Sequence, residues 1–210
     1  MSAKNARKFL DSSTETKIKT AARVVFHKKG FAGARTRDIA KEADINLALL
    51  NYYFKSKEKL FEIIMLETLA SFFQTMGMIF NDENSTLTKK IQLVAEKYID
   101  LITAEPEIPL FLLTEIRSHG AAILKKLPVL NLIMQSAFIN QYKEAVSKGE
   151  ATEPDPLHFL MNVMGLIVFP FVGNPLIKKV GKLDDRQFNM LMQDRKKLIP
   201  IWIKAMLKAK

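Results

Sequence analysis

The chain has 210 residues, of which 48% are hydrophobic, and this is enough to bury a core in one or two domains. It has no cysteine, which excludes disulfide scaffolds, thiolate zinc sites and cysteine nucleophiles and is typical of a reducing compartment. The formal net charge is +10, and residues 1–60 hold 14 Lys and Arg against 6 Asp and Glu. A basic segment confined to one end indicates a phosphate-bearing partner, either nucleic acid or lipid headgroups, although a plain solvated surface has the same composition.

Neither a secretory signal nor a membrane span is expected. The first ten residues are polar and basic, without an apolar run behind them. No stretch approaches the roughly 20 apolar residues that cross a bilayer, since the longest apolar region, residues 157–172, is broken by Asn162, Gly165 and Pro170. We therefore expect a cytoplasmic protein that has no membrane partner.

Apolar residues spaced as one face of an α-helix predict a first helix that ends near Gly30. They are Ile18, Ala21, Ala22, Val25 and Phe26. Residues 1–13 are interpreted as a flexible basic arm without a sequence-specific role, and its cations are Lys4, Arg7 and Lys8. The alternative is an arm that reaches the DNA backbone or the minor groove. His27 lies among lysines in this helix and is predicted to be a surface residue.

Two short helices are predicted next. Thr36 is placed as the N-cap of the first, residues 44–46 form a short turn, and Asn46 caps the second, from Leu47 to Phe54. This is the spacing of a helix–turn–helix, whose second helix enters the DNA major groove once a preceding helix closes the core behind it. An ordinary antiparallel helical hairpin has the same spacing and is the alternative.

The residues themselves resemble the tetracycline-repressor-like (TetR) family over about residues 14–62. The run from Thr36 to Phe61 has that family's fixed spacing, and the pattern Ala22-x-x-x-Phe26-x-x-x-Gly30-Phe31 matches its first helix. The resemblance implies a DNA-binding domain over residues 1–60. The core positions that match the family are Ile39, Ile45, Leu50 and Phe54.

The resemblance also implies the DNA contacts residue by residue. The set is Arg35, Thr36, Arg37, Leu47, Ala48, Asn51, Tyr52, Tyr53 and Lys57. Thr36, at a helix N-terminus, and Lys57 are expected to hold phosphates, and Tyr53 is expected to grip the DNA backbone. Leu47, Ala48, Asn51 and Tyr52 are expected to face the groove.

Two of these positions depart from the family pattern. Ala48 stands where the family often has glycine, and Asn51 stands where it usually has tyrosine. Asparagine pairs with the N6 and N7 edge of adenine, so Asn51 predicts a base contact rather than a phosphate contact. The alternatives are a solvated helix face for Asn51 and packing between helices for Tyr52 and Tyr53.

The rest of the chain, residues 61–210, is predicted to be a helical effector-binding and dimerisation domain, so the fold class is all-α. A long apolar helix capped by Ser56 links the two domains. Apolar periodicity predicts further helices over residues 91–102, 110–116, 128–148, 156–171 and 185–210, with Asp184-Asp185 as an acidic helix start. In the family, the last two long helices form a four-helix bundle with a second subunit. We expect the apolar faces near residues 157–168 and 188–203 to make this homodimer interface.

Met and Phe residues are frequent in this domain, and flexible Met side chains suit an adaptable apolar cavity. The predicted pocket is lined by Phe73, Met76, Phe111, Asn131, Gln135, Phe138, Tyr142 and Met161. Plain core and dimer interface explain the same composition. The expected ligand is a small apolar effector.

No enzyme motif stands out, and no metal or cofactor site is predicted, because the three histidines are far apart and no phosphate-binding glycine loop occurs. The sequence favours a repressor that is released from a palindromic double-stranded DNA operator by an apolar ligand. A basic helical protein that binds membranes or protein partners is the alternative, and an enzyme acting on an apolar substrate is a third possibility.

Overall fold

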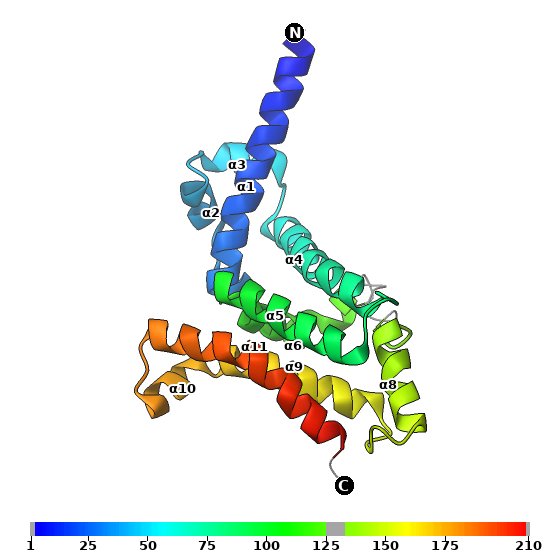
Figure 1. Cartoon of the computed structure of the whole chain (residues 1–210). Coiled ribbons are helices and arrows are strands. Elements are labelled where there is room, and N and C mark those ends of the chain that lie inside the picture. The colour runs from blue at the N-terminus through cyan, green and yellow to red at the C-terminus, as the bar shows by residue number, and fades with distance from the viewer. Residues whose placement is uncertain (1–2, 125–132, 209–210) are drawn as a thin grey trace. The chain divides into compact units, whose positions relative to one another are not determined.

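The computed structural model describes residues 3–124 and 133–208, with side chains placed for residues 13–118 and 133–208. All regular structure in these ranges is helical, which confirms the predicted all-α fold (Figure 1). Contacts divide the chain into two compact units. Unit 1 comprises Met1–Ser71 and Leu110–Ile123, and unit 2 comprises Phe72–Pro109 and Leu124–Lys210. The sequence predicted a boundary at residue 60, whereas the contacts change over inside a helix.

Unit 1 contains α1 (Ala3–Gly33), α2 (Thr36–Glu42), α3 (Leu47–Tyr53), the first part of α4 (Lys57–Phe80) and most of α6 (Ile108–Leu124). The predicted apolar face of α1 is buried: Ile18, Ala21, Ala22, Val25 and Phe26 are at most 6% exposed. The backbone of residues 3–13 continues α1 as helix, so the expected flexible arm is wrong for these residues. Most of α6 belongs to this unit, although the sequence assigned it to the second domain.

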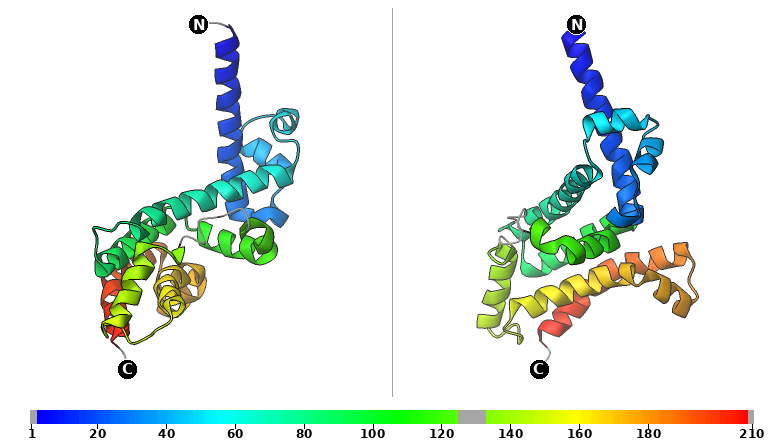
Figure 2. Two further views of the ribbon diagram at one scale, coloured as in Figure 1. Left: turned by 90° about the vertical axis from the view of Figure 1, so that its right-hand side faces the viewer. Right: turned by 180° about the vertical axis from the view of Figure 1, so that it is seen from behind.

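Unit 2 contains the remainder of α4 and five further described helices. They are α5 (Leu87–Ala104), α8 (Ala137–Ser147), α9 (Pro156–Val172), α10 (Asn174–Gly181) and α11 (Asp185–Leu207). Helix α5 packs along α11 and α9, and α8 packs on α5 and α9 (Figures 1 and 2). The short helix α10 was not predicted. Asp184 caps α11 together with Gln187 in a capping box, which confirms the predicted acidic helix start.

A proline inside α9 explains one long-range contact in unit 2. Pro170 has no N–H, so the carbonyl of Leu166 lacks its partner four residues later in the helix. Arg195 of α11 supplies the missing donor, because its Nη2 lies 2.7 Å from that carbonyl oxygen. The guanidinium group also stacks over the ring of Trp202 at 4.9 Å. The hydrogen bond from Arg195 to the Leu166 carbonyl therefore links α11 to α9 at the point where Pro170 interrupts the helical hydrogen bonds.

One expectation about membranes needs correction. By length and composition alone, α4 can cross a bilayer, and so can α9 and α10 if their 72° bend is counted as a single span. The core helices of globular proteins meet the same criterion. Helix α4 buries Leu60, Ile64 and Leu69 in the protein, each at most 1% exposed.

Candidate nucleic-acid interface

The turn between α2 and α3 holds the two helices in a helix–turn–helix arrangement. Asp44 adopts the left-handed conformation with φ of 50°, and the Ile45 N–H donates to the Ala40 carbonyl at 3.0 Å, which closes the end of α2. The Asn46 side chain accepts from the Leu49 N–H at 2.8 Å, so its predicted role as the N-cap of α3 is confirmed. Leu50, at 1% exposure, fixes α3 on the core.

The opposite face of α3 is open. Ala48 and Asn51 are exposed, and the Tyr52 side chain is 75% exposed, with its ring edge-on to Tyr53 at 5.4 Å. Leu47 and Tyr53 are partly buried. The structure therefore brings the predicted groove-facing residues onto one exposed surface of a short helix.

The start of α2 differs from the prediction. The N-cap residue is Arg35 and it makes no side-chain cap hydrogen bond, while Thr36 is the first helical residue. The predicted cap was thus wrong by one position. Thr36 still lies in the first turn, where the backbone N–H groups lack helical acceptors, and Arg35 and Arg37 on either side are exposed.

Exposed cations surround these helices. They are Lys28, Arg35, Arg37, Lys41, Lys55 and Lys59. One neighbouring lysine is engaged instead: Lys29 pairs with Asp38 at 2.7 Å and fastens the end of α1 to α2, and this pairing lowers the pKa of Asp38. The excess positive charge of the first 60 residues therefore reaches solvent beside α2 and α3.

Lys57 has a structural partner that the sequence did not reveal. Its Nζ donates to the carbonyls of Phe31 at 3.0 Å and Ala34 at 3.1 Å, and lies 4.1 Å from the centre of the Phe31 ring. An ammonium group has three N–H donors, so Lys57 can hold these carbonyls and still present a donor to a phosphate. Its contacts fix the start of α4 against the end of α1.

Helix α6 also holds the end of α1 in place. At Gly30, α1 takes φ of 64° and ψ of 179°, and the Phe31 N–H that follows donates to Glu115 Oε1 at 3.0 Å. Glu115 is only 4% exposed. Phe111, one turn earlier on α6, packs on Phe61 with ring centres 6.0 Å apart. Helix α6 thus completes the core behind the helix–turn–helix.

His27 is not the surface residue that was predicted. Its Nε2 lies 3.0 Å from Thr68 Oγ1 of α4, and its ring centre lies 4.8 Å from that of Phe111. Burial, with a smaller effect of the Arg23 charge, lowers the pKa of His27 to about 4. On the same side of α1, Lys19 and Arg23 both contact Glu67 at 2.9 Å. These groups join α1 to α4.

The described structure gives the surroundings of the predicted ligand-pocket residues one by one. Phe111 belongs to unit 1, Met161 is 59% exposed on α9, and Gln135 is exposed. Asn131 lies outside the described residues. Phe138 and Tyr142 are at most 1% exposed and stack on other rings: Phe138 on Phe80 at 4.8 Å and Tyr142 on Phe159 at 4.1 Å.

Two predicted residues do line a small cavity. It has a volume of about 160 Å³ in unit 2, and its lining consists of Phe73, Gln74, Met76, Gly77, Phe80, Asn81, Ile133 and Ser136. Most of these side chains are apolar. The described residues include no group of three His, Asp or Glu side chains placed to hold a metal ion.

The comparisons with known proteins agree with this geometry. The profile of the bacterial regulatory proteins of the tetR family matches residues 18–64, from α1 into α4. The chain is 27% identical to YttP of Bacillus subtilis, named a probable HTH-type transcriptional regulator, over 92% of this chain and 93% of that protein. It is 33% identical to the HTH-type transcriptional repressor NicS of Pseudomonas putida, over 51% of this chain and 50% of NicS.

Solved structures extend the likeness of fold to nearly the whole chain. The haemolysin II transcriptional regulator HlyIIR superposes with a TM-score of 0.66 at 20% identity, over 95% of this chain and 99% of HlyIIR. The fatty acid degradation regulator FadR from Bacillus halodurans superposes with a TM-score of 0.60 at 19% identity, over 88% of this chain and 93% of FadR. With its helix–turn–helix and its helical second unit, the chain carries a DNA-binding domain of the tetR family over residues 18–64 and is a DNA-binding transcriptional regulator.

Proposed function

We propose that this regulator is a repressor that binds a palindromic operator as a homodimer and leaves it when a small apolar ligand binds. The observation that carries the DNA-binding part is the exposed face of α3, where Asn51 and Tyr52 reach solvent while Leu50 is buried. Asn51 is proposed to read an adenine, and Leu47 and Ala48 to contact thymine methyl groups. Arg35, Thr36, Arg37, Tyr53 and Lys57 are proposed to hold the phosphate backbone.

A selection from randomised duplexes tests this assignment. The wild-type protein should enrich a sequence with two-fold symmetry. Asn51→Ala should relax the preference at one position in each half-site, with a loss of discrimination of roughly 1–3 kcal/mol. Arg37→Ala serves as the matched variant, because a lost phosphate contact weakens all sequences about equally and lowers the salt dependence by about one unit of slope. An unchanged base preference in Asn51→Ala would refute the readout role.

The homodimer is proposed from the exposed apolar side chains of the last two long helices. On α9, Leu157, Met161 and Phe169 are 49%, 59% and 64% exposed. The exposed apolar side chains of α11 are Met190 at 60%, Leu191 at 41%, Leu198 at 36% and Ile201 at 61%. Other apolar residues of the expected faces, such as Val163 and Ile199, are instead buried within unit 2. The exposed stripes suit a self-complementary interface that sets two recognition helices about 34 Å apart.

Sedimentation at micromolar concentration tests the interface. The wild-type protein should have twice the chain mass, and Ile201→Glu should produce a monomer because it places a charge within the apolar stripe. Arg186→Glu, a change at an exposed position of α11 outside these side chains, is the control. A monomeric wild-type protein would remove both the interface and the reason for a palindrome.

The effector is proposed to occupy the cavity beside Phe73 and Met76. Its volume of about 160 Å³ is close to that of the engineered apolar cavities that bind benzene, so the proposed ligand is small and apolar. A Cβ added to Gly77 meets no atom within 4 Å, so a larger side chain there can enter the cavity. Gly77→Leu should therefore block binding, while Met78→Leu, at a neighbouring position that is 66% exposed, should not.

Titration with toluene, with and without operator DNA, measures the switch. If toluene is an effector, it must weaken DNA binding by the same factor by which DNA weakens toluene binding. A coupling free energy of 1–3 kcal/mol corresponds to a factor of about 5 to 150. Toluene binding that leaves operator affinity unchanged would exclude the switch for this ligand class. We further propose a cytoplasmic location and no enzymatic activity, as the assignment to a regulator family supports.

A further inference from the structure

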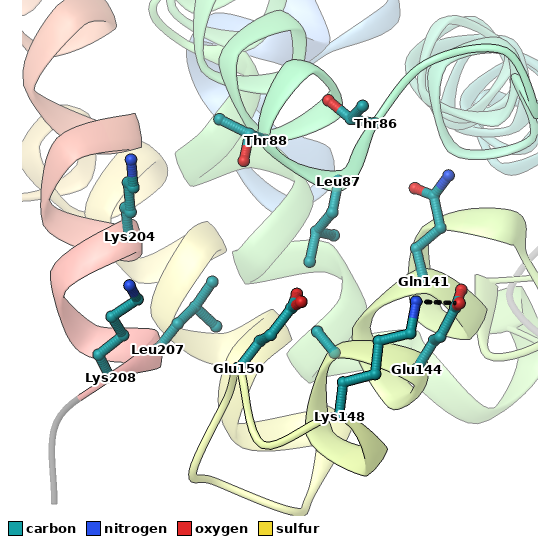
Figure 3. Close-up of a pocket in the computed structure, with 11 residues that line it drawn as sticks. Thr86, Leu87, Thr88, Gln141, Glu144, Lys148, Glu150, Lys204, Leu207 and Lys208 are labelled. Carbon is teal, nitrogen blue, oxygen red and sulfur yellow. Dashed lines mark hydrogen bonds and ion pairs between the residues drawn. The ribbon is translucent and has the colours of Figure 1, made fainter.

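A second and larger hollow lies in unit 2, away from the cavity beside Phe73. It has a volume of about 590 Å³ and lies where three helices end: the start of α5, the end of α8 and the end of α11 (Figure 3). We name it the α5–α8–α11 hollow. Leu87, Ala145 and Leu207 give it an apolar part, and most of its other lining residues are charged or polar. Its lining therefore differs in kind from that of the small apolar cavity.

Hydrogen bonds hold its walls in place. Lys90, which is fully buried, donates from Nζ to the Ser85 carbonyl at 2.7 Å and to Gln141 Oε1 at 3.0 Å, and Gln141 also donates to Ser85 at 2.9 Å. The Thr152 N–H donates to the Leu207 carbonyl at 2.9 Å. These bonds tie the loop before α5 to α8, and the loop after α8 to the end of α11. A site with fixed walls loses little entropy when a ligand binds.

The charges of the hollow favour an anion. Lys204 and Lys208 project from α11 on one side, and the Glu144–Lys148 pair, 2.6 Å apart, lies on the other (Figure 3). Glu150, between them, is the other acidic residue of the lining. Lysines outnumber glutamates, and the buried Lys90 ammonium next to the lining residue Gln141 has neutral hydrogen-bond acceptors.

Helix α5 adds donors to the same place. Thr86 is its N-cap, and its hydroxyl oxygen accepts from the Lys89 N–H at 3.2 Å. The N–H groups of Leu87 and Thr88 lie in the first turn and have no helical carbonyl to donate to. These N–H groups and the positive end of the helix dipole of 18 residues therefore lie at the hollow, together with the Thr88 hydroxyl.

From this convergence we propose that the α5–α8–α11 hollow binds a small amphipathic anion, a carboxylate or a phosphate monoester on a short apolar chain. The anionic head lies between Lys204, Lys208 and the start of α5, and the chain lies on Leu87 and Leu207. Burial lowers the pKa of Lys90, partly offset by Asp82 and Glu83, so an anion in the hollow also stabilises this charge. The proposal does not depend on DNA binding.

Calorimetric titration of the full-length protein without DNA tests it. The probes are hexanoate and hexyl phosphate, with 1-hexanol as the neutral control of the same chain length. At least one anion should saturate a single site per chain with Kd on the order of 0.1–1 mM, and hexanol should not bind there. Whichever anion binds identifies the head group. Absence of saturation by both anions up to 10-fold above this range, or equal binding of hexanol, would overturn the proposal.

Three variants locate the site. Lys204→Gln should weaken binding about 3- to 5-fold, as expected for an exposed charge pair. Glu150→Gln should tighten it about 2-fold because it removes a like charge. Lys143→Gln, an exposed charge of α8 outside the lining, should leave the Kd unchanged. A thermal melt checks that each variant is folded. If the Kd of the anion is unchanged in both Lys204→Gln and Glu150→Gln, the anion binds elsewhere, and this also overturns the proposal.

Discussion

Gly30→Ala is expected to be among the most destabilising single-methyl additions in unit 1. With φ of 64° and ψ of 179°, Gly30 occupies a region that is essentially restricted to glycine, and a side chain there costs about 1–3 kcal/mol. The new Cβ also stands 3.3 Å from Glu115 Oε1, so the carboxylate must shift away. Its hydrogen bond from the Phe31 N–H, worth about 1.5–3 kcal/mol, is then strained or lost. We expect a loss of about 3–5 kcal/mol.

Urea unfolding followed by circular dichroism, at one protein concentration, measures this loss. Gly33→Ala is the matched control, because Gly33 lies three residues later and its added Cβ meets only Lys29 Cβ at 3.5 Å, an ordinary contact. That control should be neutral or should stabilise the protein by up to about 1 kcal/mol. If the free energy of unfolding of Gly30→Ala lies within about 1 kcal/mol of the wild-type value, the backbone strain and the Glu115 contact do not destabilise the variant, and the reasoning is refuted.

Three further changes test other parts of the structure. Asp44→Gly should stabilise the helix–turn–helix by about 0.5–1 kcal/mol in urea unfolding, because Asp44 has φ of 50°; destabilisation would contradict this. In the folded protein the pKa of His27 is lowered to about 4, so neutral His27 contributes its full stabilisation of the fold above pH 6.5. This stabilisation is lost as the pH falls from 6.5 to 4. After allowance for partial exposure, the free energy of unfolding should fall by about 1–2 kcal/mol. His27→Gln should abolish that dependence in the same pH window, and a persisting slope would assign it to other groups. Phe138→Ala, at a fully buried ring stacked on Phe80, should cost about 3–5 kcal/mol and lower the melting temperature, whereas a change below 1 kcal/mol would mean that the site collapses around the lost ring.

Features that depend on neighbouring residues could be predicted from the sequence. The buried face of α1 follows from a period of 3.6 residues, and the caps at Asn46 and Asp184 act over three residues. The start of α2 was missed by one residue, because side-chain capping favours Thr36 as the N-cap, whereas the observed N-cap, Arg35, makes no side-chain cap hydrogen bond. Helix α10 was missed because it is only eight residues long and has no fully buried residue, although Ile177 packs against the core of unit 2.

Features that depend on distant contacts could not be predicted. The bond from the Phe31 N–H to Glu115 joins residues 84 positions apart, and nothing near Glu115 in the sequence marks it as buried. The surroundings of the predicted pocket residues depend on distant contacts in the same way, because composition counts Met and Phe residues but does not give their direction. Met161 is exposed on α9, whereas Phe138 is fully buried and stacks on Phe80.

Helix α3 and its neighbours are thus supported from outside residues 18–64, which match the family profile. Unit 1 owes part of its core to Phe111, and a buried carboxylate, Glu115, holds the end of α1 immediately before α2 begins. The same end of α1 is held from α4 through Lys57. Helices α4 and α6 both include residues that belong to unit 2. Under the proposed function, a ligand that moves either helix needs no contact with α3 to change its fit to DNA. The few kcal/mol held in these bonds is comparable to the 1–3 kcal/mol of a typical allosteric coupling.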